Sequence, residues 1–276
     1  MFWRKLPLIM ILLLPSILSA VPASQSGEYG QGAVQTMNRL KALTPDDFKE
    51  LLVQAKAGNA ESQYWVGLVY QDGDGRIISR DTNEAVRWFA KAADQDYLLA
   101  ETCLGLAILH SNPSEGQRWL KKAAERGDAQ AQFWLATGYE RGWFGQKNPE
   151  AALRWYAEAA KGGQPDAQFV LGRKYEEGEG VTQDYALAVE LYTKAADQAP
   201  DLGGAGVARR HLAELYLDGR GVPQDYVQAY KWLYIGGARD LSEVKAKLTP
   251  AQLAQVQQEI REWKAARPEG RPSPPF

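Results

Sequence analysis

Two near-copies of a glycine-containing motif carry the residue types that could bind phosphate or calcium. They are "YEEGEGVTQDY" (Tyr175–Tyr185) and "YLDGRGVPQDY" (Tyr216–Tyr226), which share seven of eleven letters. A phosphate loop needs a preceding strand and a Lys-Ser/Thr pair after its last glycine, and neither accompanies these motifs. The related "DGDG" at Asp72–Gly75 lacks the third acidic ligand and the closing glutamate of a calcium loop. We therefore interpret the glycines as turns.

A second candidate for chemistry is Ser242-Glu243-Val244-Lys245, which matches the Ser-x-x-Lys signature of serine penicillin-recognising enzymes. That chemistry also uses Ser-Asp-Asn and Lys-Thr-Gly companions, which do not occur in the sequence. A hydrolase of β-lactams or peptidoglycan is thus kept only as an alternative.

The remaining reactive residue types do not assemble into a site. His110 and His211 have no Cys or acidic partner at metal-ligand spacing, and Cys103 is the only cysteine, in the apolar helical pattern "ETCLGLAIL". We predict that this thiol is a small buried hydrophobe. The sequence predicts no catalytic site, no cofactor and no metal.

One interval of seven residues recurs along the chain and joins a capping residue to a large apolar marker. In the two motifs it links Asp184 to Leu191 and Asp225 to Trp232. The other three occurrences are Asp81 to Trp88, Asn112 to Trp119 and Asn148 to Trp155. Successive markers are 31, 36, 36 and 41 residues apart, an average of 36, which is typical of helix–turn–helix repeats.

The recurring residue types suit packed pairs of helices. Asp or Asn accepts hydrogen bonds from the free N–H groups at a helix start. Small residues stand three positions before each marker and four and five after it, so bulky and tiny side chains alternate at helical spacing and neighbouring helices can approach closely. Gly178 and Gly219 follow Tyr175 and Tyr216 by three residues, where a left-handed glycine ends a helix. The motifs are therefore turns of a repeat.

Two stretches carry a family resemblance: "GDAQAQFWLATGYERG…NPEAALRWYAEAAKGG" and "DAQFVLGRKYEEGEGVTQDYALAVELYTKAADQ". They resemble Sel1-like repeats, relatives of the tetratricopeptide repeat, over about residues 58–238. The resemblance implies an all-α, right-handed α/α superhelical solenoid that serves as a protein-interaction scaffold. Some proteins of this kind have been labelled β-lactamases, which is a further reason to state the hydrolase alternative.

The ends of the chain differ from the repeats. The first residues combine a positive start, an apolar run of about 13 residues and small residues at Ala20 and Ala23, after either of which cleavage of a secretory signal peptide is expected. "LTPDDFKELLVQAKAG" and "LTPAQLAQVQQEIREWKAA" each begin with Thr-Pro, at Thr44 and Thr249, and are predicted to be capping helices.

The predicted organisation has ten segments. They are a signal peptide (1–23), a linker (24–43), an N-terminal capping helix (44–57), repeats at 58–95, 96–126, 127–162, 163–198 and 199–238, a C-terminal capping helix (239–266) and a disordered Pro-rich tail (267–276).

Candidate partner-binding residues come from aligning the first helices of the repeats. Positions at intervals of three and four form a stripe that includes Tyr64, Phe133, Phe169, Arg173 and Arg210. By analogy with related solenoids this stripe lines the concave surface, where aromatic side chains would anchor a peptide or a partner helix. The alternative interpretation is that these rings pack on the adjacent unit.

The loop "RGWFGQKN" offers a second candidate, because Trp143 and Phe144 replace the charged residue and the glycine of the other loops. A Trp-Phe pair at a solvent position suggests a contact patch, and burial against the next loop is the alternative.

Charge and export restrict the class of partner. The formal net charge of −2 provides no basic field for nucleic acid or an anionic membrane. We predict a non-catalytic scaffold or adaptor that is exported to the periplasm of the bacterial cell envelope and binds a protein or peptide. A secreted effector that engages host proteins is the alternative.

Overall fold

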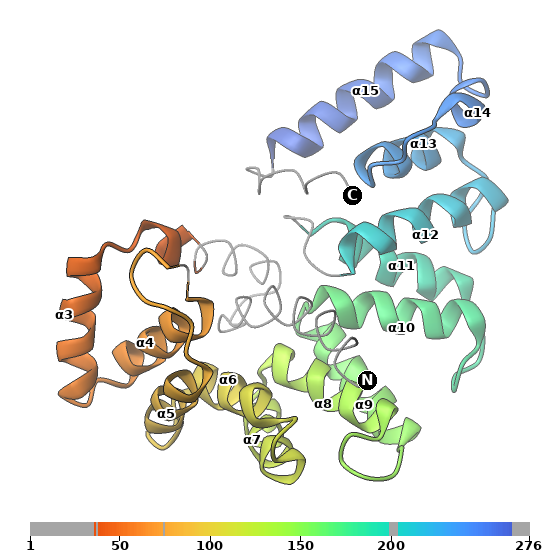
Figure 1. Cartoon of the computed structure of the whole chain (residues 1–276). Helices are drawn as coiled ribbons and strands as arrows, with labels where there is room; N and C mark the ends of the chain where they lie inside the picture. The colour runs from red at the N-terminus through yellow and green to blue at the C-terminus, as the bar shows by residue number, and fades with distance from the viewer. Residues whose placement is uncertain (1–35, 37, 74, 199–203, 267–276) are drawn as a thin grey trace, which may run out of the picture. The chain divides into compact units, whose positions relative to one another are not determined.

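The computed structural model describes residues 36, 38–73, 75–198 and 204–266, and α-helices form the regular secondary structure of this part of the chain (Figure 1). The all-α prediction is confirmed. The chain divides into two compact units, one ending at Glu158 and the other beginning at Ala159. The predicted signal peptide and Pro-rich tail, and most of the predicted linker, lie outside the described residues.

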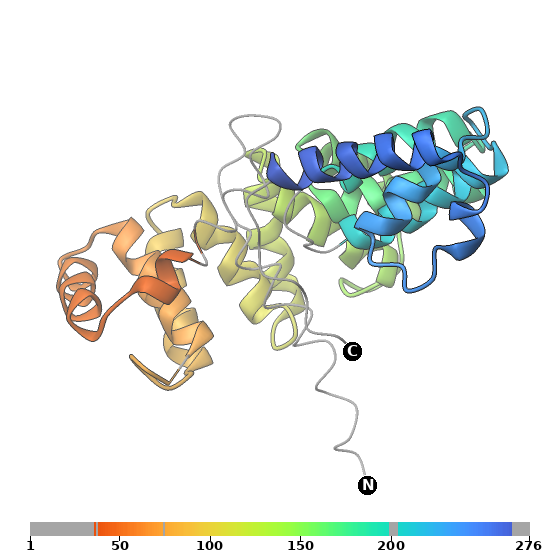
Figure 2. The same cartoon turned by 90° about the horizontal axis from the view of Figure 1, so that it is seen from above.

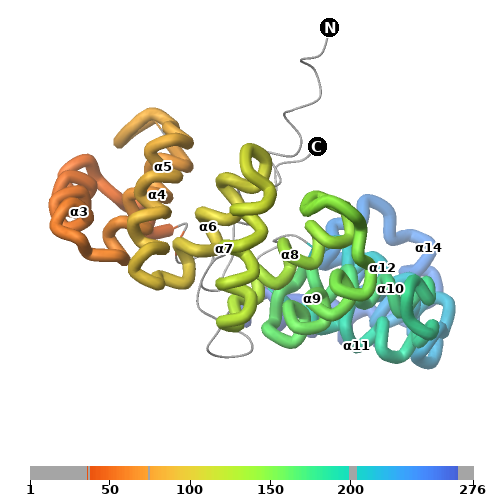
Figure 3. Tube along the Cα trace, turned by 90° about the horizontal axis from the view of Figure 1, so that it is seen from below, coloured from red at the N-terminus to blue at the C-terminus, as the bar shows by residue number. Residues whose placement is uncertain are grey.

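The N-terminal unit contains a short helical segment at residues 38–42, within the predicted linker, followed by a series of longer helices (Figure 3). Those helices are α3 (Pro45–Lys56), α4 (Ala60–Asp72), α5 (Thr82–Ala93), α6 (Leu98–Ile108), α7 (Pro113–Glu125), α8 (Ala129–Arg141) and α9 (Pro149–Lys161), the last of which runs across the boundary between the units. Helices from α3 to α8 pack against their neighbours in chain order.

The C-terminal unit contains the last residues of α9 and, after them, six helices of its described part, the last of them in the predicted C-terminal capping segment. Its helices are α10 (Pro165–Glu177), α11 (Tyr185–Ala196), α12 (Ala205–Asp218), α13 (Tyr226–Ile235), α14 (Ser242–Lys245) and α15 (Pro250–Ala265). Helix α15 packs along α13, as Figure 2 shows, and the four-residue helix α14 lies between them in the chain.

The predicted helix starts and stops are present. Asp81, Asn112, Asn148, Asp184 and Asp225 each accept a hydrogen bond from a backbone N–H of the helix that follows. Gly178 and Gly219 end α10 and α12 with φ of 73° and 67°, in the left-handed region. The motifs that resembled a phosphate loop are therefore helix C-caps.

Tiny residues allow close approach where the pattern places them. A Cβ on Gly105 of α6 would lie 2.9 Å from Cγ of Leu120, and a Cβ on Gly116 of α7 would lie 2.9 Å from the carbonyl oxygen of Gly105. These two helices touch backbone to backbone, so only glycine fits on both sides of the contact.

A column of buried polar side chains links each first helix to the helix before it. The amides of Gln63, Gln132 and Gln168 donate to the carbonyl oxygens of Ala55, Ala124 and Ala160 at 3.0–3.1 Å. Each of these carbonyls also accepts from the backbone N–H three residues further on, so the amide adds a second hydrogen bond that ties the two helices together. In α12, Arg209 takes the same role and donates from Nε to the Ala196 carbonyl at 3.0 Å.

The second repeat departs from this column because it carries Glu101, whose ionised carboxylate only accepts hydrogen bonds. Glu101 is fully buried, and Lys122 and Arg126 of α7 each bring a nitrogen to 2.8 Å from its oxygens. The two cations offset the cost of burying the carboxylate. Cys103, two residues further on, is also fully buried, and burial raises the pKa of its thiol.

Candidate interaction surface

The stripe is not a uniform outward face in the N-terminal unit. Tyr64 is only 1% exposed, and its ring lies 5.3–6.2 Å from the rings of Trp65, Phe89 and Tyr97. The expectation that Tyr64 contacts a partner is therefore corrected: its ring belongs to the core. Phe89, the residue directly after the Trp88 marker, and Tyr97, the residue before α6, both pack on this ring.

Phe133 of α8 occupies the equivalent position but is only half-buried. Its ring lies 5.8 Å from that of Tyr156, the residue after the Trp155 marker, and 5.4 Å from that of Trp134. The Tyr156 hydroxyl donates to Glu140 at 2.9 Å. The stripe is thus partly accessible in the third repeat, where one edge of the aromatic group remains at the surface.

The Trp143-Phe144 loop packs back on the helix that precedes it. The Trp143 ring stacks on that of Trp134, with centroids 6.2 Å apart and planes at 23°. Phe144 lies edge-on to Tyr139 at 5.5 Å, over Gly138 of α8. Both side chains are half-buried, so the loop contributes aromatic surface next to Phe133 rather than a separate exposed patch.

In the C-terminal unit the stripe reaches the surface. The half-buried ring of Phe169 contacts Tyr192 at 5.9 Å and His211 at 5.5 Å. Arg173, one turn later on α10, is 40% exposed and lies 4.0 Å from Glu177. Arg210 of α12 is exposed. Phe169, Arg173 and Arg210 therefore combine a fixed ring with two accessible guanidinium groups.

A hydrogen-bonded cluster supports this surface, and the stripe pattern did not identify it. The Tyr192 hydroxyl donates to Glu176 Oε2 at 2.7 Å, and His211 Nδ1 lies 3.1 Å from the same oxygen. Arg220 Nη1 lies 3.6 Å from the other carboxylate oxygen of Glu176, and burial raises the pKa of the Tyr192 hydroxyl. The sequence feature that could have identified this cluster is the tyrosine directly after the marker, which occurs as Tyr156 and again as Tyr192.

These residues do not form a reaction centre of the kinds considered. Ser242 and Lys245 are both exposed, whereas a lysine that activates a serine needs a desolvated setting. In the part of the chain that the structure describes, His, Cys, Asp and Glu side chains do not gather in threes as a metal site would require. Among the described helices, none combines the length and apolar character needed to cross a membrane.

The comparisons with solved structures concern the fold. A Sel1 repeat protein from Oxalobacter formigenes superposes with a TM-score of 0.60 at 23% sequence identity, covering 79% of this chain and 99% of that one. At this identity the likeness shows the fold alone, which is the helical-repeat solenoid predicted from the sequence.

Sequence relatives match over shorter stretches. An uncharacterized protein of Neisseria meningitidis serogroup B is 37% identical over 103 residues, covering 36% of this chain. An F-box protein of Arabidopsis thaliana is 34% identical over 112 residues, covering 40% of this chain. The matched regions span only 22% and 28% of those two relatives.

The Sel1 repeat family matches five segments that fill most of the chain: residues 60–97, 97–128, 129–164, 165–200 and 206–240. These segments coincide with the helix pairs from α4–α5 to α12–α13. With five matched repeats and the corresponding helix pairs, the chain belongs to the Sel1 repeat family.

Proposed function

We propose that this protein is a non-catalytic scaffold of the bacterial cell envelope that holds a partner protein or peptide against the first helices of its repeats. Sel1 repeat proteins generally serve as protein-interaction scaffolds and are typically non-catalytic. The envelope location rests on the signal-peptide pattern in the first 23 residues.

One observation supports the choice of surface above the others. Phe169, Arg173 and Arg210 reach the surface at adjoining positions of two consecutive first helices. The Phe169 ring is held by Tyr192 and His211, so little side-chain freedom is lost when a partner covers it. Arginine and aromatic side chains are the residue types that dominate binding energy at protein interfaces.

The arginines provide a cleaner test than the rings, because truncating Phe133 or Phe169 would also remove core contacts. We expect the double substitution Arg173→Glu and Arg210→Glu to reduce the amount of protein that the purified chain captures from an envelope extract. A matched control reverses two exposed cations elsewhere in the same unit, Lys194→Glu on α11 and Arg261→Glu on α15.

The readout is quantitative mass spectrometry of the captured proteins, with thermal melts by circular dichroism to show that both variants are folded. The proposal predicts that one or more proteins are lost from the Arg173/Arg210 variant and retained by the control. Equal capture by both folded variants would show that this face does not bind the partner. Cell fractionation with an antibody tests the location, and a cytoplasmic protein would contradict the envelope assignment.

A further inference from the structure

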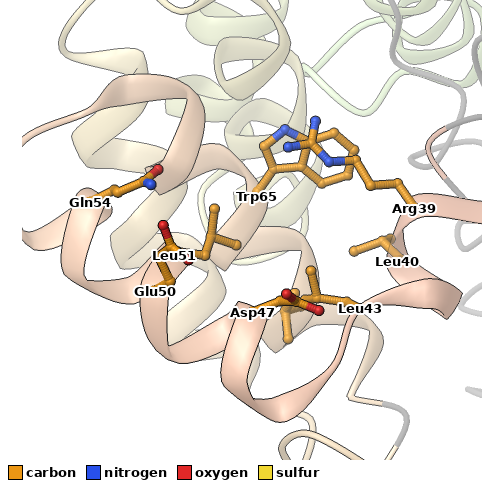
Figure 4. A pocket seen from close by; sticks show the side chains of 9 residues that line it. Arg39, Leu40, Leu43, Asp47, Glu50, Leu51, Gln54 and Trp65 are labelled. Carbon is orange, nitrogen blue, oxygen red and sulfur yellow. The ribbon is translucent and has the colours of Figure 1, made fainter.

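The N-terminal unit has a pocket of about 270 Å³ between residues 38–43, α3 and α4 (Figure 4). Leu40, Leu43, Leu51 and Val69 line it with aliphatic carbon, and the indole of Trp65 forms one wall. The volume is below the range of about 300–1,000 Å³ that is usual for sites of drug-sized molecules. The pocket therefore suits one side chain of a larger partner.

Helix α3 contributes a face that the fold does not bury. Asp47, Glu50, Leu51 and Gln54 line the pocket at intervals of three, one and three residues, which places them on one side of the helix. Leu51 borders the side that packs into the core, because it is three residues from Phe48 and four from Ala55.

Two residues that line the pocket, Arg39 and Trp65, are held in place by contacts within the N-terminal unit. The Arg39 guanidinium lies 4.2 Å from the centre of the Trp65 ring, and Arg39 Nη1 lies 3.5 Å from Glu61. The Trp65 indole N–H donates to the same Glu61 carboxylate at 3.2 Å. Arg39 is thus already paired, and Trp65 is held in its orientation before anything binds.

The rim of the pocket has more negative than positive charge. Asp47 and Glu50 line it, while its one cation, Arg39, is neutralised by Glu61. Thr44 donates to Asp47 from its backbone nitrogen at 2.9 Å, and this contact orients the Asp47 carboxylate at the start of α3 without cancelling its charge. A positive group beside the pocket would therefore be attracted, and a negative one repelled.

We propose that this pocket binds a short segment of a partner protein that inserts one aliphatic side chain and places a Lys or Arg directly beside it. The aliphatic lining selects the inserted side chain, and Asp47 with Glu50 selects its basic neighbour. The inference rests on the proposed scaffold function and adds to it a second contact point, in the N-terminal unit, with a stated preference.

Disulfide tethering tests this preference without knowledge of the partner. The full chain carries Gln54→Cys at the exposed edge of the pocket, and its single native thiol, Cys103, is fully buried and does not compete. The probes are four synthetic pentapeptides that begin Cys-Gly-Gly and end Leu-Arg, Leu-Glu, Ser-Arg or Ser-Glu. The fraction of mixed disulfide at equilibrium with a small thiol is read by intact-mass spectrometry.

The Leu-Arg probe is expected to label the Gln54→Cys protein roughly tenfold more than the Ser-Arg probe, because a leucine side chain leaves water. It is also expected to exceed the Leu-Glu probe. Adding Glu50→Gln should weaken the preference for Arg over Glu and leave the preference for Leu over Ser in place. Val53→Cys is the matched control, since Val53 is on the same helix, 67% exposed, and outside the pocket.

Equal labelling by the four probes at Gln54→Cys would overturn the inference, as would the same preferences at Val53→Cys. A pocket already filled by another stretch of this chain would also give no preference, and would equally count against it. The outcome is separate from the capture experiment with the Arg173/Arg210 variant. Tethering that fails while capture still depends on those arginines refutes the pocket alone.

Discussion

Asp128 caps helix α8 with a carboxylate that is almost entirely removed from water. Its side chain accepts from the Ala131 backbone nitrogen at 2.6 Å and from the Thr102 hydroxyl at 3.1 Å, and the residue is 3% exposed. Burial raises the pKa of this carboxyl from its ordinary value of 3.8 to about 6, against the opposing effect of its hydrogen bonds with Ala131, Thr102 and Gln130.

The raised pKa makes Asp128 a source of pH-dependent instability. Well below pH 3.8 the carboxyl is protonated in both the folded and the unfolded state and does not change the free energy of unfolding. As the pH rises from about 4 to about 6, the unfolded chain releases this proton while the folded protein retains it, so the free energy of unfolding falls. Two pKa units correspond to about 3 kcal/mol, and this penalty persists above pH 6.

The substitution Asp128→Asn should remove that penalty and keep the cap. Asn59 is the corresponding N-cap in the first repeat and accepts from the Ser62 nitrogen at 2.8 Å, so an asparagine fits this position of the fold. We expect the variant to gain up to about 3 kcal/mol over the parent at pH 8, and less than about 1 kcal/mol at pH 4, where the carboxyl of the unfolded chain is only about half ionised.

The assay is urea unfolding followed by circular dichroism at both pH values. Asp184→Asn is the control, because Asp184 caps α11 from an exposed position and undergoes the same chemical change. The reasoning would be refuted if the stability difference between Asp128→Asn and the parent were the same at pH 4 and pH 8. A gain of equal size and pH dependence in the Asp184→Asn control would refute it as well.

Three further outcomes follow from the packing. Gly116→Ala should lower the free energy of unfolding by about 1–3 kcal/mol, because its Cβ would press on the backbone of α6. Gly206→Ala in α12 should raise the free energy of unfolding by about 1 kcal/mol, because its Cβ would meet nothing within 4 Å. Urea unfolding of both variants checks this contrast. Gln168→Leu should cost about 1 kcal/mol in the same assay, since it removes the hydrogen bond from the Gln168 amide to the Ala160 carbonyl, which keeps its bond from the Gly163 N–H. Cys103 should not react with a thiol reagent at pH 8 until denaturant unfolds the protein, because it is fully buried and burial raises the pKa of its thiol. Rapid labelling of the native protein would contradict this buried position.

Most of the architecture was predictable because its determinants are local. An Asp or Asn at a helix start and a glycine at a helix end act through the backbone within a few residues, so their positions in the sequence locate the helices. The interval from Asp184 to Leu191 and its four repetitions located the second helix of every pair. The same frame explained the glycine motifs as turns, and the structure agrees.

The accessible residues were harder to predict, because exposure depends on the neighbouring helix. Tyr64, Phe133 and Phe169 occupy the same position of their repeats, yet Tyr64 is buried and the other two are half-buried. Helical periodicity states which side of a helix a residue is on, but not whether the next helix covers that side. The ring after each marker contacts all three residues at 5.8–6.2 Å and so does not distinguish them. Tyr64 also packs on Tyr97, the residue before α6, at 5.3 Å, and this contact comes from outside its own helix pair.

The sequence alone determined that this protein is a chain of helix pairs in a Sel1 repeat pattern, because caps, tiny residues and apolar markers recur at fixed short intervals. Only the tertiary structure decided that residues 38–42 form a helix and that a pocket lies between this segment, α3 and α4. Only the tertiary structure, likewise, brought Tyr192, His211 and Arg220 into contact with Glu176. These arrangements join residues up to 44 positions apart in the chain, and short-range spacing carries no information about such distances.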